Sequence, residues 1–580
     1  MSRNAEIAAL FEEYADLLEA QDVEYKPNTY RRAAESIREY PTAIEDLASK
    51  GQDAVEEIDG VGDAISSKVI EYVDTGAIEE LEGERAKLPV AMDELTSVEG
   101  VGPKTVGTLY EALGVENLAD LETVASAGEI QEIKGFGPKT EQNILSGLEF
   151  ARKASERELL GDTRPLADDL LDYLRGHDGI ERAEVAGSIR RWRETSGDVD
   201  VLAASDDLNG VIVAFTDWGR VERVIESGEN KASVVANGIR VDLRVVVPEE
   251  FGSALQYFTG SKAHNIRFRN RALDRDLKVN EYGVFDVSDT NEEGQRAGER
   301  VAGRTEGEMY AALDLAWIPP ELREDTGEID AAAADALPDL IEEGDLRGEL
   351  HTHTDWSDGT ESIDEWIASA ETFGHEYLCI SDHATGPGMV GGVGLSDEDL
   401  REQAATIREA AADAAIEVFA GVEANIDSEG GLSVAEDVLE ELDLVVASPH
   451  SGLDMDSEAA TDRLVAAIEH PQTDILGHPT GRLLTRRPGL DPDLQRVAEA
   501  AADNGVALEI NANPARLDLW GRAVKVAVEA GATVVINTDA HSPAEFENDR
   551  YGIHTARRGW AGPADVLNAW TASEVRAFVE

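Results

Sequence analysis

One group of acidic residues has the spacing of a two-metal site. Asp198 and Asp200 lie two residues apart in the run GDVDVL, and Asp242 lies in the β-branched run RVDLRVVV. On a strand, a spacing of two directs both carboxylates to the same face of the sheet. Three carboxylates that converge there need cations to stay ionised, so we expect two divalent ions, Mg²⁺ or Mn²⁺. Such a pair can activate an attacking 3′-hydroxyl and stabilise a departing pyrophosphate.

The alternative for these aspartates is a solvated polar strand face, which is the commoner meaning of an isolated Asp-x-Asp pattern. A Gly187-Ser188 turn and the pair Arg190-Arg191 precede the aspartates by about ten residues. A glycine turn offers backbone amides, and arginines offer bidentate donors, so together they suit a triphosphate. Their proximity favours the metal site.

A second group of histidines and carboxylates occupies the last 230 or so residues. The chain reads ELHTHTDWSDG from residue 349, and then ISDHA, GVEAN, ASPHSG, LGHPTG and NTDAHS. Each acid or histidine follows an apolar strand, and the C-terminal face of a barrel would collect such residues. Imidazoles and carboxylates together suit Zn²⁺, Mn²⁺ or Fe²⁺. The expected ligands are His351, His353, Asp358, His383, Glu423, His450, His478, Asp539 and His541.

A glycine pattern recurs three times in the N-terminal quarter. The copies are IDGVGDAISSKVIEY, VEGVGPKTVGTLYEAL and IKGFGPKTEQNIL. Each predicts a tight turn that presents backbone N–H groups at the start of a helix, and these groups bind phosphate without side-chain charge. Three copies favour binding to a nucleic-acid backbone and resemble helix-hairpin-helix motifs. The expected DNA-binding glycines are Gly60, Gly62, Gly100, Gly102, Gly135 and Gly137.

The elements that must position these groups change in type along the 580 residues. Apolar residues at helical spacing dominate the N-terminal part, short β-branched runs such as VDVLAA, GVIVAF and RVDLRVVV mark a mixed α/β layer, and apolar strands alternate with alanine-rich helices at the C-terminus. We therefore predict a multidomain α+β and α/β protein. The expected divisions are 1–85, 90–155, 156–247, 248–318, a linker at 319–344, and a barrel-like domain at 345–580.

The net charge of −68 requires a physical explanation. The acidity is spread along all segments, and lysine is scarce relative to arginine, so we interpret the chain as adapted to a salt-rich cytoplasm that screens self-repulsion. No apolar run could span a membrane, and the N-terminus does not resemble a secretory signal, which indicates a cytoplasmic protein. The single cysteine, Cys379, excludes an intrachain disulfide and is expected to be buried.

The segment Gly-Ser-x-Arg-Arg followed by Gly-Asp-x-Asp resembles the nucleotidyltransferase palm of X-family DNA polymerases. By this resemblance Asp198, Asp200 and Asp242 bind the metals. The palm would be followed by a thumb-like nucleotide-binding domain. The implied nucleotide-binding residues are Gly187, Ser188, Arg191, Tyr257, Phe258, Gly260 and Asn265. Arg269 falls where the family contacts the template. The sequence departs from the family at Trp192 and Arg193, where a glycine and a shorter polar or basic residue are usual.

The first helical segment resembles the lyase domain of the same family. In YKPNTYRRAAESI and the following GVGDAISSKVIEY, Lys68 stands at the Schiff-base position, with Lys26 and Tyr30 near the expected 5′-phosphate pocket. A desolvated lysine with a lowered pKa could attack the aldehyde of an abasic sugar. Ala64 replaces a basic residue of that pocket, and a surface lysine in a DNA-binding helix is an equal alternative. Abasic-site cleavage by lyase or by endonuclease chemistry stays open.

The C-terminal series resembles the polymerase-and-histidinol-phosphatase (PHP) superfamily, which binds up to three metal ions. The resemblance assigns His351, His353, Glu423 and Asp539 to one ion. A second ion, bridged by Glu423, would bind His450 and His478, and a third would bind Asp358, His383 and His541. Many bacterial and archaeal X-family polymerases carry this domain, and there it resembles a 3′-to-5′ exonuclease.

These resemblances imply a gap-filling repair polymerase with a 3′-end phosphoesterase. The expected partners are gapped or nicked DNA, deoxynucleotides and other repair enzymes, with the chain acting as a monomer and not on membranes. One alternative joins a small-molecule phosphatase to an RNA-end-adding nucleotidyltransferase, and the Tyr257-Phe258 segment speaks against it. Another is a non-catalytic scaffold for DNA ends, which the intact metal ligands disfavour.

Overall fold

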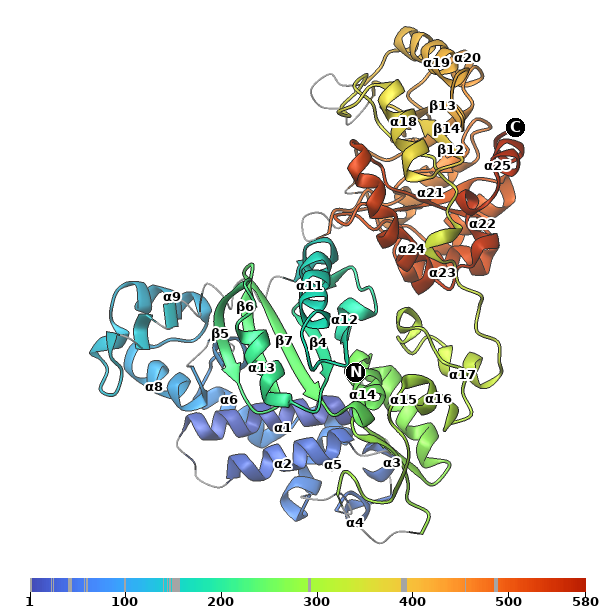
Figure 1. Cartoon of the computed structure of the whole chain (residues 1–580). Helices are drawn as coiled ribbons and strands as arrows, with labels where there is room; N and C mark the ends of the chain where they lie inside the picture. Colours follow the sequence, from blue (N-terminus) through green and yellow to red (C-terminus); the bar gives the residue numbers. More distant parts are fainter. Residues whose placement is uncertain are drawn as a thin grey trace. The chain divides into compact units, whose positions relative to one another are not determined.

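The computed structural model is drawn in Figure 1, and its backbone contacts divide the described part of the chain into two compact units. One contains residues 1–157, 212–243 and 262–303, and the other contains 158–211, 244–261 and 304–580. Within the described residues, no helix combines the length and apolar character needed to cross a membrane. The structure describes residues 3–21, 23, 26–39, 44–48, 50–56, 58, 61–96, 98, 101–138, 140–142, 144–145, 148, 157–289, 294–386, 394–453, 455–484 and 489–580.

The first unit begins with short helices that share one apolar core. The long helix α1 packs against α2, α6 and α8, and its buried face includes Phe11 and Leu17. Glycine ends two of these helices: Gly76 after α5 and Gly114 after α8 adopt left-handed backbone conformations. The helices are α1 (Arg3–Ala20), α2 (Lys26–Glu39), α3 (Ile44–Ala48), α4 (Gln52–Val55), α5 (Asp63–Thr75), α6 (Glu79–Lys87), α7 (Met92–Thr96), α8 (Pro103–Leu113) and α9 (Leu118–Ser126).

A five-stranded sheet with the order β2-β4-β7-β6-β5 carries the Asp-x-Asp segment. Strand β7 shows a strict alternation of buried and more exposed residues, as expected for a strand with one face on a core. Helix α11 packs against β2 and β4. The bounds are β1 (Glu158–Leu159), α11 (Leu160–Arg175), β2 (Arg182–Val185), α12 (Gly187–Arg190), β3 (Thr195–Ser196), β4 (Val199–Ala204), α13 (Leu208–Thr216), β5 (Val221–Ser227), β6 (Lys231–Ala236) and β7 (Ile239–Val246).

The β-branched run GVIVAF is a helix, α13, and its interpretation as part of a strand was wrong. The Asp207 carboxylate accepts a hydrogen bond from the Gly210 amide at 3.0 Å, which helps to start the helix. Val211 and Phe215 are buried and lie four residues apart, while Val213 is 49% exposed. This four-residue spacing of the buried side chains decides the conformation over the local β-propensity.

The segments after the palm sheet contain helices and a small antiparallel sheet. The residues expected to form a linker are ordered, and Leu322 and Ile329 there are buried. The bounds are α14 (Phe251–Thr259), α15 (Lys262–Leu273), β8 (Leu277–Asn280), β9 (Gly283–Asp286), β10 (Glu299–Ala302), α16 (Glu306–Ala311), η3 (Pro320–Leu322) and α17 (Glu328–Ala333).

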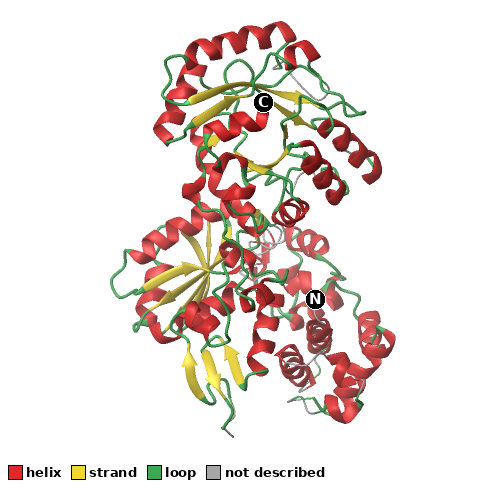
Figure 2. Cartoon of the chain, turned by 90° about the vertical axis from the view of Figure 1, so that its right-hand side faces the viewer, coloured by secondary structure: helices red, strands yellow, loops and turns green. Residues whose placement is uncertain are grey.

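The C-terminal domain is built on a seven-stranded parallel sheet whose strands follow one another in sequence order. Figure 2 shows helices around these strands. Thr352 and Ala540, which follow the first and the last strand, form a parallel bridge, so the barrel is nearly closed. The strands are β11 (Gly348–Glu349), β12 (Tyr377–Ile380), β13 (Glu417–Asn425), β14 (Leu444–Ser448), β15 (Ile475–Leu476), β16 (Ala507–Asn511) and β17 (Val534–Asn537).

Helices cover the outside of this barrel, and both faces of the strands are buried. Six apolar runs read as strands match β12 to β17 in order, and they are YLCISDH, IEVFAGVEA, LDLVVASPH, TDILGHP, VALEINA and TVVINTDA. Cys379 is buried in β12, as expected. The helices are α18 (Ile363–Phe373), α19 (Asp397–Ala411), α20 (Glu436–Leu439), α21 (Ser457–Ile468), α22 (Leu494–Asn504), α23 (Gly521–Ala530), α24 (Asp549–Arg558) and α25 (Ala572–Val579).

Candidate active sites

The three palm aspartates converge, as their spacing predicts. Asp198 precedes β4, Asp200 lies on β4 and Asp242 lies on the neighbouring β7. One carboxylate oxygen from each residue lies within 4.8 Å of the others. Arg240 donates to Asp242 at 3.0 Å. The group is partly exposed and matches the carboxylate environment that divalent cations with oxygen ligands prefer.

Gly187 opens the loop that faces these aspartates, and only glycine fits there. Its φ is 59°, and a Cβ at this position would lie 2.2 Å from the Asp200 carboxylate oxygen Oδ2. The Ser188 hydroxyl lies 2.6 Å from the Ser196 hydroxyl. The predicted phosphate loop therefore lies directly beside the carboxylates, as a triphosphate site bound to metal ions requires.

The two arginines of this loop pair with a buried acid, Glu306, and a partly buried one, Glu324. Arg190 forms a two-pronged ion pair with Glu306 at 2.7 and 2.8 Å. Arg191 donates to Glu324 at 3.0 Å and to the Thr259 carbonyl. Burial lowers the pKa of Arg191, and the charge of Glu324 opposes this effect. The sequence predicted Arg191 as a phosphate ligand but gave no indication of Glu306 or Glu324, which lie more than 100 residues away.

The expected nucleotide segment forms the end of α14. The Tyr257 and Phe258 rings meet edge to face with centroids 5.1 Å apart, and the Arg244 guanidinium lies 4.5 Å from the Phe258 ring. Gly260 follows with a φ of 66°. Asn265 and Arg269 are four residues apart on α15 and therefore share one face of that helix.

The glycine turns take the predicted place before helices. Gly62 and Gly102 are the N-cap residues of α5 and α8, and neither helix has a side-chain cap. Gly135 has a φ of 103° in the third turn, next to Gly137. No side-chain oxygen therefore caps the first-turn amides of α5 and α8. Gly60 and Gly100 lie outside the described residues.

Lys68 is buried on α5, but its environment differs from the expected one. Its ammonium lies 3.0 Å from Glu80 and 6.0 Å from the Tyr30 ring centroid. Burial lowers the pKa of Lys68, but the hydrogen bond to Glu80 and the charges of Tyr30 and Glu80 outweigh it and raise the pKa. The expected lowering of this pKa was therefore wrong, because the sequence did not show Glu80 nearby. Lys26 is exposed at the start of α2.

The nine expected ligands of the C-terminal domain gather at the carboxyl ends of the barrel strands. Glu423 lies at the centre, and one of its oxygens is 2.9 Å from His478 and 3.2 Å from His450. The groups with ligand atoms within 4.8 Å of one another are His353-Asp358-His383-His541, His351-His353-Asp539 and His383-Glu423-His450.

Hydrogen bonds from neighbouring strands orient two of these imidazoles. His351 Nδ1 lies 2.8 Å from Glu509, and His450 Nδ1 lies 2.7 Å from the Asn425 amide oxygen. In each ring the other nitrogen, Nε2, is left to face Glu423. Outer partners of this kind fix the tautomer and direction of metal-binding histidines. The sequence analysis missed Glu509 and Asn425, although both lie on the barrel strands β16 and β13.

The donor atoms at the centre of this site are better placed to coordinate metal ions than to form hydrogen bonds with one another. Among the residues that the structure describes, several buried ligand atoms lack a hydrogen-bond partner. They are His351 Nε2, His353 Nδ1 and His478 Nδ1, while His383 Nδ1 and Glu423 Oε2 lie 2.5 Å apart outside hydrogen-bond geometry. Buried polar atoms are rarely left without partners, so these atoms support coordination of cations. Asp539 has a φ of 54°, a conformation that is uncommon outside glycine and often marks a functional site.

The acidic ligands are ionised near neutral pH. Burial would raise the pKa of Glu423, but the charges of His450, His383 and His351 lower it well below its usual range. Burial would also raise the pKa of Asp358, yet the hydrogen bond from His541 and the charge of His383 lower it to about 2. The site therefore offers anionic oxygens together with imidazoles, the donor set that suits Zn²⁺, Mn²⁺ or Fe²⁺.

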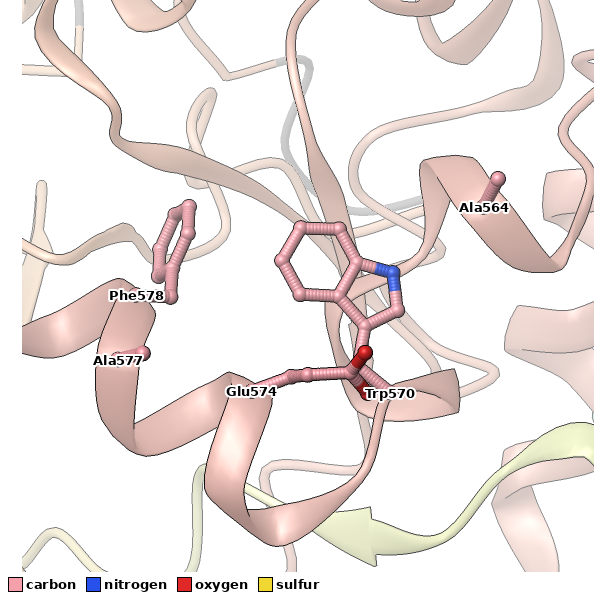
Figure 3. Close-up of a pocket in the computed structure, with 5 residues that line it drawn as sticks. All are labelled: Ala564, Trp570, Glu574, Ala577 and Phe578. Atoms are coloured by element: carbon pink, nitrogen blue, oxygen red, sulfur yellow. The ribbon is translucent and has the colours of Figure 1, made fainter.

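A separate apolar pocket lies at the C-terminal helix α25 (Figure 3). Its volume is about 500 Å³, and the Trp570 and Phe578 rings meet edge to face 5.9 Å apart. None of the nine ligands lines it. The lining residues are Ala564, Trp570, Glu574, Ala577 and Phe578.

Comparisons with known proteins match the helical, thumb and PHP parts of the chain. Family models match a helix-hairpin-helix domain at residues 2–78, a helix-hairpin-helix tandem at 92–149, a DNA polymerase beta thumb at 254–324 and a PHP domain at 349–513. The chain is 35% identical over 582 aligned positions to the DNA polymerase/3′-5′ exonuclease PolX of Bacillus subtilis, with 99% of both chains covered. This chain belongs to the X family of DNA polymerases that carry a PHP domain.

More distant relatives match parts of this X-family polymerase. A DNA polymerase lambda of Rattus norvegicus is 24% identical over 55% of the chain and 56% of its own length. A probable phosphatase of Caldanaerobacter subterraneus is 35% identical over 33% of the chain and 75% of its own length. The predicted family and fold class are thus confirmed. The roles of individual residues and the adaptation to salt stay predictions.

Proposed function

We propose that this chain fills short gaps in DNA with its palm and shortens or cleans 3′ ends with its PHP domain. The observation that carries the proposal is the presence of two complete ligand constellations in one chain that aligns end to end with a DNA polymerase/3′-5′ exonuclease. Each constellation lies on its own sheet, so the two reactions can be removed separately by substitution.

In the polymerase reaction, Asp198, Asp200 and Asp242 would hold two Mg²⁺ or Mn²⁺ ions. These ions, when bound, supply activation of the 3′-hydroxyl and charge neutralisation on the pyrophosphate. The backbone amides and side chains of the protein would position the nucleotide and the DNA. The Gly187 and Ser188 loop amides and the Arg191 charge would hold the triphosphate, while Gly260 and the Tyr257-Phe258 pair would face the sugar, with Asn265 at the base. Arg269 and the glycine turns would hold the DNA.

In the PHP reaction, the nine histidines and carboxylates would bind up to three ions of Mn²⁺, Zn²⁺ or Fe²⁺. Bound ions of this kind lower the pKa of an attacking water and polarise phosphoryl oxygens. Glu509 and Asn425 hold the rings of His351 and His450 in the direction that coordination needs. The anionic Glu423 belongs to the group with His383 and His450, and His383 is shared with the group of Asp358 and His541.

We also infer the setting in which this activity operates. We propose a cytoplasmic enzyme that acts on gapped or nicked DNA and deoxynucleotides, and the end-to-end likeness to a DNA polymerase/3′-5′ exonuclease supports this. We propose that it acts as a monomer and receives its gaps from other repair enzymes.

The test compares two variants on one substrate, a 3′-labelled duplex with a one-nucleotide gap in molar KCl with Mg²⁺ or Mn²⁺. Asp198→Ala should lower nucleotide incorporation by about 10³-fold or more and leave 3′ shortening unchanged. His353→Ala should do the reverse. Asp206→Ala and His177→Ala are matched controls, because both residues are exposed and outside the two sites. Loss of both activities in either variant would contradict the two-site proposal, as would their absence in the unmutated chain.

A second candidate for the PHP domain is hydrolysis of small phosphomonoesters, which the likeness to probable phosphatases favours. The same preparations, given p-nitrophenyl phosphate in place of DNA, decide between the two substrates. Faster turnover of the small ester than of the DNA end would favour the phosphatase. Comparing deoxy- with ribonucleotides at the palm tests the RNA-end alternative in parallel.

A further inference from the structure

Trp192, the residue at which the sequence departs from the family, is buried against the PHP domain. It follows the phosphate loop with a φ of 52° and is 6% exposed. Its ring stacks on His554 of helix α24, with centroids 3.7 Å apart and planes 9° from parallel. The Arg164 guanidinium lies 4.5 Å from the same indole. A glycine at position 192 would leave these partners without their central ring.

Further contacts surround this stack within the same compact unit. Asp168 on α11 forms an ion pair with Arg550 on α24 at 3.1 Å. Gly161, also on α11, lies so close to Pro514 that a Cβ there would be 2.6 Å from the proline side chain. The palm and the PHP domain therefore meet through aromatic, ionic and close-packed contacts. We call these residues the seam.

One PHP residue, Arg558, reaches the phosphate loop itself. It donates a 2.6 Å hydrogen bond to the Arg191 carbonyl and lies 3.2 Å from Glu324. Glu324 is the acid that receives the Arg191 guanidinium at 3.0 Å. Arg558 is only 8% exposed at its side chain, so its charge is poorly screened by water. The backbone and the side chain of Arg191 are thus both fixed, directly or through Glu324, by one arginine of the other domain.

We propose that Arg558 is a positioning residue of the polymerase site, which holds the loop of Gly187 to Arg193 ready for the triphosphate. This rests on the proposed function, because it assumes that the loop binds deoxynucleotides. A loop fixed before binding loses less conformational freedom when the nucleotide arrives, and affinity rises accordingly. Removal of Arg558 frees the Arg191 carbonyl and leaves Glu324 with Arg191 and the more distant Arg193 as its partners. Removal of Arg558 should therefore weaken nucleotide binding and leave the rate of the chemical step nearly unchanged.

The test measures steady-state incorporation on gapped DNA by the full chain. Arg558→Ala should raise KM for the deoxynucleotide by roughly three- to tenfold, the effect of one hydrogen bond to a charged group, with kcat within about twofold. The rate of 3′ shortening should also stay within about twofold. Arg496→Ala is the matched control, because Arg496 forms an exposed ion pair with Asp462 elsewhere in the PHP domain. An unchanged KM would overturn the proposal.

A double-mutant cycle keeps the test valid if Arg558→Ala weakens folding. Glu324→Gln retains the shape of the acid, and its effect on KM should not add to that of Arg558→Ala, since both act through Arg191. Independent, additive effects would contradict the assigned role, as would equal losses of polymerase and nuclease activity. Incorporation by the unmutated chain in the same assay tests the proposed function separately.

Discussion

Glu423 is the residue on which the PHP site depends most. Histidines surround its carboxylate, and their nitrogens lie between 2.5 and 3.8 Å from its oxygens. Glu423→Gln keeps the shape but removes the negative charge that holds cations among the imidazoles. We expect 3′ shortening to fall by about 100-fold or more while gap filling is retained. Glu417→Gln on the same strand is the control, and more than a tenth of normal nuclease activity in Glu423→Gln would contradict the assignment.

A second prediction concerns the pKa of the single residue Lys68, which its partner Glu80 raises. Glu80→Gln removes the acid that raises the pKa of Lys68, so burial should then lower that pKa. Any Schiff base with an abasic sugar forms from the neutral amine, so borohydride trapping near pH 7.5 should increase about tenfold. Trapping by the unmutated chain should rise with pH. Lys68→Ala should abolish it, and Glu79→Gln, an exposed neighbour, should leave it unchanged. Equal trapping by Glu80→Gln and the unmutated chain would exclude Lys68 as the nucleophile.

Residues that act directly were easier to predict from the sequence than residues that position them. Asp198 and Asp200 were recognised from their spacing of two residues at the start of one strand, β4. Glu509, by contrast, reaches His351 across 158 residues, and Glu324 reaches Arg191 across 133. Such pairs depend on which strands and helices become neighbours, and a single sequence does not encode that as a local pattern.

The same distinction holds for secondary-structure elements. Long apolar runs predicted β12 to β17, because a strand buried on both faces is apolar throughout. The run GVIVAF has the composition of such a strand but forms helix α13. Its buried side chains include Val211 and Phe215, four residues apart, which is a helical spacing. The strand β11 was not predicted, because its two residues, Gly348 and Glu349, do not form an apolar run.

Asp474 stands immediately before β15 and links that strand to β14 by accepting a hydrogen bond from the Val445 amide at 2.8 Å. Burial raises its pKa to about 7, against the effect of that hydrogen bond. Between pH 3.8 and about 7 the native state therefore keeps a proton that the unfolded state has released. The stability of the native state consequently falls as the pH rises through this interval.

Asp474→Asn should remove this pH dependence, because the amide oxygen can still accept from Val445 but cannot ionise. At pH 8 the variant should be more stable than the unmutated chain by on the order of 1–3 kcal/mol, and near pH 4 the two should be equal. Calorimetric melting across this range measures the difference. Asp443→Asn is the matched change one strand earlier, where Asp443 accepts from the Ala420 amide. A loss of stability at pH 8 in Asp474→Asn would contradict the argument.

At the scale of the whole molecule, the sequence predicted the order of the parts but not the seam between palm and PHP domain. The helix-hairpin-helix copies, the palm motif and the PHP motifs each lie within short stretches of chain. Trp192 and His554 meet across more than 360 residues, and neither has a spacing that indicates the other. Trp192 was recognised only as a departure from the family pattern, and the structure supplies its physical reason.

The net charge of −68 leads to a last prediction, which concerns salt. Like charges spread over one chain favour expansion, and the effect weakens as the Debye length shortens from about 10 Å at 0.1 M to about 3 Å at 1 M. We expect the melting temperature to rise by at least roughly 10 °C between about 0.2 and 2 M KCl. Gapped-DNA binding should weaken far less over this range than it does for proteins that rely on lysine and arginine contacts, because backbone amides at the glycine turns act at short range. Full stability and activity in dilute buffer would contradict the first expectation, and a steep loss of binding with salt would contradict the second.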